Sequence, residues 1–287
     1  MATYPNTDAA SDIWSLRDVY KAEAGDEWPS SQVLFDLSSA SYDSNTTGDL
    51  SNGNLGGVYF KPDGLSFYVA SYTNDNVQQY DLTTAWDLST ASLANQKGGG
   101  VGTPRDIFFS PDGLRMFTVD ATTDDVDENV LSTAWDLSTA SAGNSFGVQA
   151  QEGTVNSIYF HPDGTYFYVS GTQSDSVNQY SLSTAWDLTT ASFVQSFSVS
   201  SQTVTPNGIS FNQNGRQMYI VEQTNDVVLE YNLSTPWDIS TASYNTSFSV
   251  ATEESLPQGI FIREDGLKFF ICGAGGDSVD RYSMDNL

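Results

Sequence analysis

The chain has 287 residues, of which 36 are acidic and 10 basic, so its formal net charge is −26 at pH 7. This charge repels phosphate backbones and anionic headgroups, which argues against nucleic acid as a partner and against membrane insertion. Charged residues make up only 16% of the chain and aromatic residues 13%, and the abundance of Ser, Thr, Asn and Gly favours an all-β fold with many tight turns.

Residues 1–32 precede the repeats and form an N-terminal arm. The segment has no basic start or apolar core of a signal peptide, so we expect a protein made in the cytoplasm without one. Its apolar residues have partly helical spacing and predict a docking arm that anchors the protein to a neighbouring subunit. They are Trp14, Leu16, Val19, Tyr20 and Trp28. An arm folded back on the side of the main domain is the alternative.

Two markers recur through the rest of the chain. A turn glycine, mostly in Pro-Asp-Gly, returns every 49 or 51 residues, at Gly64, Gly113, Gly164, Gly215 and Gly266. A Trp-Asp turn keeps the same period, at Trp86, Trp135, Trp186 and Trp237. A repeat near 50 residues is typical of one four-stranded propeller blade.

Each repeat carries four strand signals, seen best in the third copy. The first strand contains Ile158 and Phe160 and ends at the glycine turn; the second covers 167–169, and the third ends near Leu182. The fourth, SFVQSFSV, follows the Trp-Asp turn. We name these strands A to D.

The two ends of the chain complete each other. The fifth repeat stops at Leu287, one position before its Trp-Asp turn is due, and FDLSSASYD from Phe35 onward supplies the missing turn and strand D in register with Trp86. The sequence therefore predicts one domain over 33–287, a five-bladed β-propeller with four-stranded blades in which 33–46 complete the last blade.

Several single residues could be catalytic or bind a ligand. The residues at the same repeat positions in the other blades indicate a structural role for them instead. His161 shares a polar position beside the turn with Lys61 and Arg263, and Cys272, the only cysteine, shares a small-residue column. The Trp residues share one slot, which indicates packing between blades. Asp106 is the one acid at the start of a strand A, and a glycosidase needs two carboxylates. We therefore predict no catalytic residue.

Carboxylates crowd the loop of blade two. Asp120, Asp124 and Asp125, with Asp127 and Glu128 nearby, are weak candidates for a Ca²⁺ site, since the segment lacks the glycine and spacing of an EF-hand loop. Asp124 also belongs to a column of turn aspartates, whose carboxylates commonly accept backbone hydrogen bonds. The expectation is no bound cofactor, with Ca²⁺ as the alternative.

The connections between blades, from strand D to strand A, differ in sequence, whereas the Pro-Asp-Gly and Trp-Asp turns repeat almost unchanged. Variable loops on a rigid frame usually carry recognition, so we place a binding surface on the face of the D–A connections.

The repeats over 35–287 resemble YVTN-type Pro-Asp-Gly propeller repeats, and PDGLxxYV followed by LSTAWDLSTAS is similar to repeats in virion proteins of tailed, particularly marine, bacteriophages. The arm DIWSLRDVYKAEAGDEWPSS resembles a segment near the start of many phage structural proteins. The resemblance implies a non-enzymatic virion component, tail-associated or capsid-decorating, whose arm docks to other virion proteins while the propeller projects outward.

Two alternatives of other classes stay open. A host-attachment module that binds a cell-surface glycan or protein would use the variable face. A glycoside-acting enzyme would need a second carboxylate beside Asp106.

Overall fold

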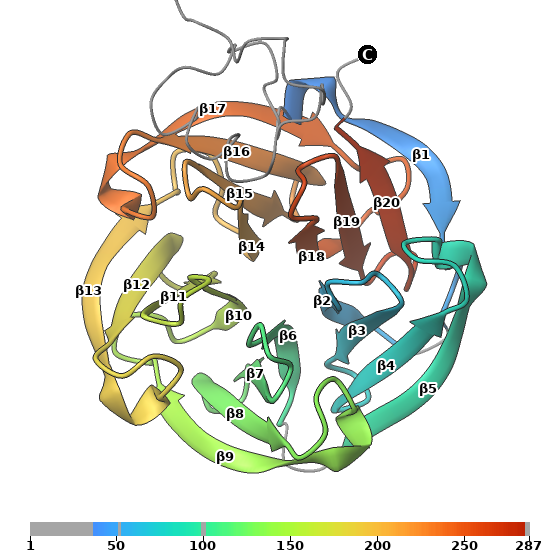
Figure 1. The fold of residues 1–287 in the computed structure, drawn as a ribbon. Helices are drawn as coiled ribbons and strands as arrows, with labels where there is room; N and C mark the ends of the chain where they lie inside the picture. The colour runs from blue at the N-terminus through green and yellow to red at the C-terminus, as the bar shows by residue number, and fades with distance from the viewer. Residues whose placement is uncertain (1–36, 51–52, 99–101, 285–287) are drawn as a thin grey trace, which may run out of the picture.

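The computed structural model describes residues 37–50, 53–98 and 102–284. Five four-stranded antiparallel sheets surround a central axis, each with strand A innermost and strand D outermost (Figure 1). The predicted all-β, five-bladed propeller with four-stranded blades is confirmed.

The strands follow one another as A, B, C and D in every blade. Blade one consists of β2 (Leu55–Phe60), β3 (Ser66–Ser71), β4 (Asn76–Leu82) and β5 (Ala91–Gly98). Blade two consists of β6 (Pro104–Phe109), β7 (Arg115–Asp120), β8 (Asp125–Leu131) and β9 (Ala140–Gly147). Blade three consists of β10 (Val155–Phe160), β11 (Tyr166–Gly171), β12 (Ser176–Leu182) and β13 (Ala191–Ser198).

Blade four consists of β14 (Pro206–Phe211), β15 (Gln217–Glu222), β16 (Val227–Leu233) and β17 (Ala242–Ser249). Blade five consists of β18 (Pro257–Ile262), β19 (Lys268–Gly273), β20 (Val279–Ser283) and the N-terminal β1 (Ser41–Thr46). A single 3₁₀ turn precedes each strand D: η1 (Leu37–Ser39), η2 (Leu88–Thr90), η3 (Leu137–Thr139), η4 (Leu188–Thr190) and η5 (Ile239–Thr241).

Ring closure by the N-terminal strand is confirmed. β1 pairs antiparallel with β20, with Ser41 opposite Ser283 and Thr46 opposite Asp280, and Figure 1 shows the blue strand completing the red blade. The Thr47 hydroxyl accepts a hydrogen bond from the Val279 N–H at 2.9 Å. Phe35 lies outside the described residues.

The two sequence markers, the turn glycine and the Trp-Asp turn, contact each other on one face of the ring. Gly64 has φ +69°, which favours glycine, and a Cβ there would lie 2.2 Å from the indole of Trp86. The Trp86 N–H donates to the Gly64 carbonyl at 2.9 Å. The same contact recurs at Gly113, Gly164 and Gly215, so the glycine both makes the turn and accommodates the tryptophan.

Apolar clusters fill the seams between neighbouring blades and hold most of the core. Phe117, Phe160 and Phe167, for example, pack together where blades two and three meet. No helix among the described residues has the length and apolar character needed to cross a membrane.

Candidate functional site

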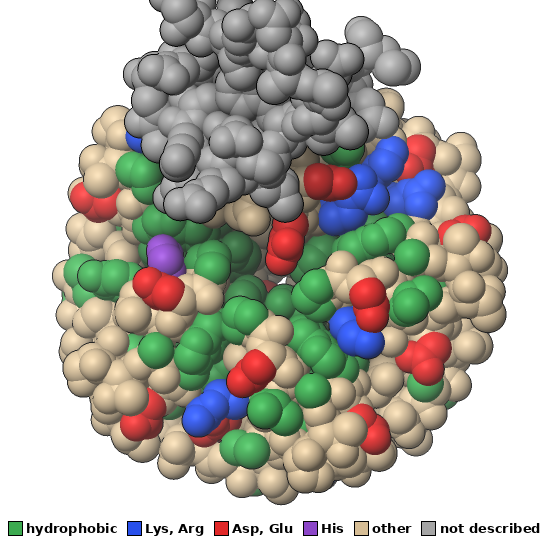
Figure 2. All heavy atoms as spheres, viewed as in Figure 1, with side chains coloured by type: hydrophobic (Ala, Val, Ile, Leu, Met, Phe, Trp, Pro, Cys, Tyr) green, Lys and Arg blue, Asp and Glu red, His purple; other side chains and the backbone are tan. Residues whose placement is uncertain are grey.

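A pocket of about 200 Å³ lies at the axis, on the face of the Pro-Asp-Gly turns. Its walls are the five inner strands and the turns that follow them. Figure 2 shows apolar side chains gathered around this central opening. The predicted binding surface is the opposite face, with the variable D–A connections, so the prediction does not include this pocket.

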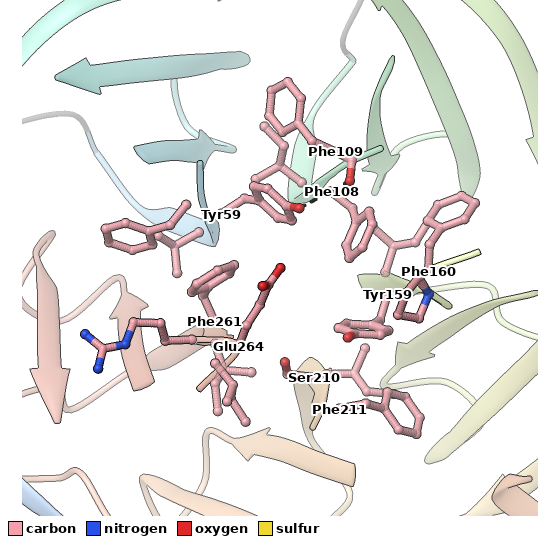
Figure 3. Close-up of a pocket in the computed structure, with 18 of the residues that line it drawn as sticks. Tyr59, Phe108, Phe109, Tyr159, Phe160, Ser210, Phe211, Phe261 and Glu264 are labelled. Atoms are coloured by element: carbon pink, nitrogen blue, oxygen red, sulfur yellow. Dashed lines mark hydrogen bonds between the residues drawn. The ribbon is translucent and has the colours of Figure 1, made fainter. Parts of the chain in front are cut away.

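One column of the repeat supplies the inward-facing wall. The second-last residue of strand A points toward the axis in every blade, and these residues are Tyr59, Phe108, Tyr159, Ser210 and Phe261 (Figure 3). Alternation along a β-strand explains this, because every second side chain faces the same way. Blades one, two, three and five each place an aromatic ring in the pocket, whereas blade four places a hydroxyl there.

The aromatic rings contact one another around the axis. Tyr59 lies 5.1 Å from Phe108 and 5.4 Å from Phe261 between ring centroids, and Phe108 lies 5.2 Å from Tyr159, all edge to face. Blade four continues these contacts only through Phe211, the residue after Ser210, whose ring lies 5.2 Å from that of Tyr159. Ser210 therefore leaves a recess in the inner column of rings, between Tyr159 and Phe261.

Glu264 brings a carboxylate into this aromatic pocket. It follows β18 in the Pro-Asp-Gly turn of blade five, where blades one to three have Pro62, Pro111 and Pro162 and blade four has Gln213. Figure 3 shows its side chain extending toward the centre of the pocket. Within the described residues Glu264 makes no hydrogen bond or ion pair.

The tyrosine hydroxyls in the pocket stay protonated near neutral pH. Burial, and secondly the charge of Glu264, raise the pKa of Tyr159 well above its ordinary value. Burial, followed by Tyr159 and Glu264, does the same for Tyr59, whose hydroxyl donates to the Phe109 carbonyl at 3.3 Å. No partner of the Tyr159 hydroxyl is found in the described part of the chain.

Asp106 lies at the inner end of the pocket. Its carboxylate accepts hydrogen bonds from the Ile107 and Ile158 N–H groups at 2.8 and 3.0 Å and from the Ser157 hydroxyl. Burial raises its pKa to about 7, although these bonds act in the opposite direction. Asp106 therefore ties blade two to blade three.

The other residues singled out from the sequence have structural surroundings. His161 pairs with Asp163 at 2.6 Å, and its ring lies 4.5 Å from that of Trp237, at the rim. Cys272 is fully buried, which raises its thiol pKa. Trp86 and Trp186 pack against phenylalanines as predicted, but they also line the pocket.

The carboxylates of blade two do not converge. Asp120 accepts the Thr122 N–H at 2.7 Å, and Asp124, at φ +56°, accepts the Val155 N–H at 3.4 Å. Asp125 pairs across the strands with Asp120. Across residues 37–284, apart from the undescribed 51–52 and 99–101, no three His, Cys, Asp or Glu side chains are grouped to hold a metal ion. The Ca²⁺ hypothesis stays a prediction.

The docking-arm residues Trp14, Leu16, Val19, Tyr20 and Trp28 lie outside the described residues. The assignment of 1–32 as an arm, its virion partners and a location in the virion stay predictions.

The chain matches the family model described as "Lactonase, 7-bladed beta-propeller" over residues 52–285. No curated protein matches it significantly.

Several solved propellers are similar in fold. A protein of Bacteroides uniformis, provisionally named as a 6-phosphogluconolactonase, is 17% identical with a TM-score of 0.50, over 77% of this chain and 64% of that one. A propeller domain from Myceliophteria thermophila is 12% identical with a TM-score of 0.50, over 85% and 99%. Hydrazine synthase of Kuenenia stuttgartiensis is 15% identical with a TM-score of 0.50, over 81% and 59%. The chain spans less than two thirds of the first three solved structures it matches.

The family match contradicts the predicted non-enzymatic role as a virion structural or host-attachment component, because it points to a lactonase-type enzyme. The prediction that the protein is not an enzyme is wrong for the same reason. The physical reason is that the sequence prediction counted one acid, Asp106, whereas the pocket also contains the carboxylate of Glu264, 158 positions later in the chain. The match covers β2 to β20, and the chain belongs to this lactonase propeller family, as a member with five blades.

Proposed function

We propose that the protein is a lactone hydrolase and that the central pocket is its active site. The observation that carries the proposal is the carboxylate of Glu264, which extends into the centre of an aromatic pocket and is held there by no other described side chain. Membership of a lactonase family, and the activity provisionally named for the Bacteroides uniformis protein, support the reaction class.

The chemistry needs one base and one route for its proton. Glu264 takes a proton from water as the water oxygen bonds to the carbonyl carbon of the lactone. The bond between that carbon and the ring oxygen then breaks. The proton passes from Glu264 to the ring oxygen, so the product is an open-chain hydroxy acid and the carboxylate is regenerated.

Tyr159 is placed to stabilise the negative charge that forms on the carbonyl oxygen. Its raised pKa keeps the hydroxyl protonated, so it donates a hydrogen bond throughout the reaction. The surrounding rings exclude water, which strengthens this bond. The recess at Ser210 gives the lactone ring room beside Glu264.

The test is hydrolysis of δ- and γ-lactones, followed as acid release at constant pH and corrected for the spontaneous rate. We expect Glu264→Gln to lower kcat/KM by about 100-fold or more, the usual effect of removing a general base. Glutamine already occupies this turn position in blade four, as Gln213, so the fold should be kept.

Glu253→Gln is the matched control. It removes the same charge from a D–A connection on the opposite face, where Glu253 contacts the Tyr282 hydroxyl at 3.5 Å. Its activity should equal that of the unchanged protein. Hydrolysis no faster than the spontaneous reaction, or equal activity in Glu264→Gln, would refute the proposal.

A further inference from the structure

Three basic side chains in the turns around the pocket mouth are each paired with an aspartate two residues further on. Lys61 pairs with Asp63 at 2.8 Å, and His161 contacts Asp163 at 2.6 Å. In blade five, both Nε and Nη2 of Arg263 contact Asp265, at 2.7 and 2.5 Å. Figure 2 shows basic and acidic side chains side by side around the opening.

Among the described residues that line the pocket, Arg263 is the only basic one. Besides its bidentate pair with Asp265, its guanidinium lies 5.5 Å from the centre of the Trp86 ring. An arginine that is already engaged by a carboxylate has few donors left for a phosphate. The charge of Glu264 adds repulsion for any anion at the pocket centre.

The interior suits a ring without charge. The aromatic wall offers flat apolar surfaces, the volume is about 200 Å³, and Ser210, Gln213 and Glu264 add polar groups to the wall formed by blades four and five. Sugar-type rings bind such sites by placing one apolar face on an aromatic ring and turning their hydroxyls toward polar groups.

We infer that the substrate is an uncharged lactone ring and that the paired aspartates make the pocket select against phosphorylated lactones. This inference rests on the proposed function, and it names the class of substrate for the same site. It also sets this chain apart from the activity provisionally named for the Bacteroides uniformis protein.

The experiment compares δ-gluconolactone with its 6-phosphate in turnover, and the corresponding gluconolactam with its 6-phosphate in binding by calorimetry. The lactams are not hydrolysed, so their binding tests the selectivity even if turnover fails. We expect the uncharged compound of each pair to be favoured at least tenfold.

Asp265→Asn should narrow this preference several-fold, because it frees Arg263 for the phosphate. The turn tolerates asparagine, since Asn214 holds the same position in blade four and accepts the Arg216 N–H at 2.9 Å. Asp112→Asn is the matched control. It removes an equal charge at the equivalent turn of blade two, where Asp112 accepts a hydrogen bond from the neutral Ser110 hydroxyl at 2.6 Å, and should leave the preference unchanged.

The possible outcomes separate the proposed lactone hydrolysis from the inferred selectivity for an uncharged ring. Preference for the phosphorylated compound, equal binding of both lactams, or binding of neither overturns the inference. Selective lactam binding without any turnover supports the inference about ligand class and refutes hydrolysis. An equal shift in Asp265→Asn and Asp112→Asn would assign the selectivity to net charge and overturn the role of the paired arginine.

Discussion

The seam between blades two and three and the seam between blades one and two use the same columns of the repeat with different residues. In the first, the Tyr180 ring stacks on Phe167 at 4.8 Å and meets Phe146 edge on at 5.7 Å, while its hydroxyl contacts Gln151 at 3.1 Å. The apolar cluster there has 12 buried residues. This seam is apolar and rich in aromatic rings.

The seam between blades one and two has Asn129 in the column of Tyr180, and Lys97 in that of Phe146. Asn129 is 1% exposed, and neither its amide nitrogen nor its amide oxygen has a partner among the described residues. The apolar cluster at this seam has eight buried residues in the described part of the chain. A buried amide without partners destabilises the folded state.

The seams differ at the axis as well. Asp106 of blade two bonds to Ser157 and Ile158 of blade three, whereas blade one presents Gly57, where a Cβ would lie 1.8 Å from the Asp106 carboxylate. The seams of this repeated architecture are therefore not equivalent. The seam between blades one and two is the weaker one at both its inner and its outer end.

The largest expected effect on stability comes from placing a residue of the weaker seam, asparagine as at Asn129, at the same position of the stronger seam. Tyr180→Asn removes a fully packed ring and should lower the free energy of unfolding by about 4 kcal/mol, as for other large-to-small core changes. Urea unfolding measures it. Tyr180→Phe, which keeps the ring, should cost only about 1 kcal/mol. Losses of equal size in both variants would contradict the comparison.

The bond at the axis should make the stronger seam sensitive to pH. The folded pKa of Asp106, about 7, is raised above the ordinary aspartate value of 3.8, so the folded state binds the proton more tightly than the unfolded state does. Its contribution is fully present below pH 4 and is lost as pH rises toward 7, by about 2 kcal/mol between pH 5 and 7. Stability measured across this range should fall less in Asp106→Asn than in the unchanged protein; parallel curves would disprove it.

The smallest effect is a gain. Asn129→Leu replaces a buried amide without described partners by an apolar group of similar size, and should raise the free energy of unfolding by about 1 kcal/mol in urea unfolding. Asn207→Leu is the control, because Asn207 is buried but contacts Asn156 at 3.0 Å and Gln223 at 3.3 Å, and it should lose stability. A loss in Asn129→Leu would show that this seam is not underpacked.

The fold could be predicted from the sequence because its signals are local and repeated. Gly64 must adopt a positive φ beneath Trp86, so the two markers keep one period, and that period predicts both the number of blades and the closure of the ring by the N-terminal strand β1. The strands expected around Phe160 and Leu182 lie where they were placed.

The site could be predicted only in part, because its residues are the ones that differ from those at the same repeat position in the other blades. Asp106 was recognised as the one acid in its column, but its bonds to Ser157 and Ile158 depend on how far strand A reaches toward the axis. Glu264 occupies a turn position whose other members are prolines and Gln213, and the turn alone does not identify it as a site residue. That the turn residue of one blade reaches into a pocket lined by all five blades is a property of the closed ring.

The closing strand has a mechanical consequence. Ser41 lies opposite Ser283 at the end of the β1–β20 pair from which both chain termini continue. A force applied between the termini would therefore break the β1–β20 hydrogen bonds one after another, starting at Ser41. It would not load all of these hydrogen bonds at once. The chain should therefore yield at low force when it is pulled by its ends, and β1 should be the first strand to leave.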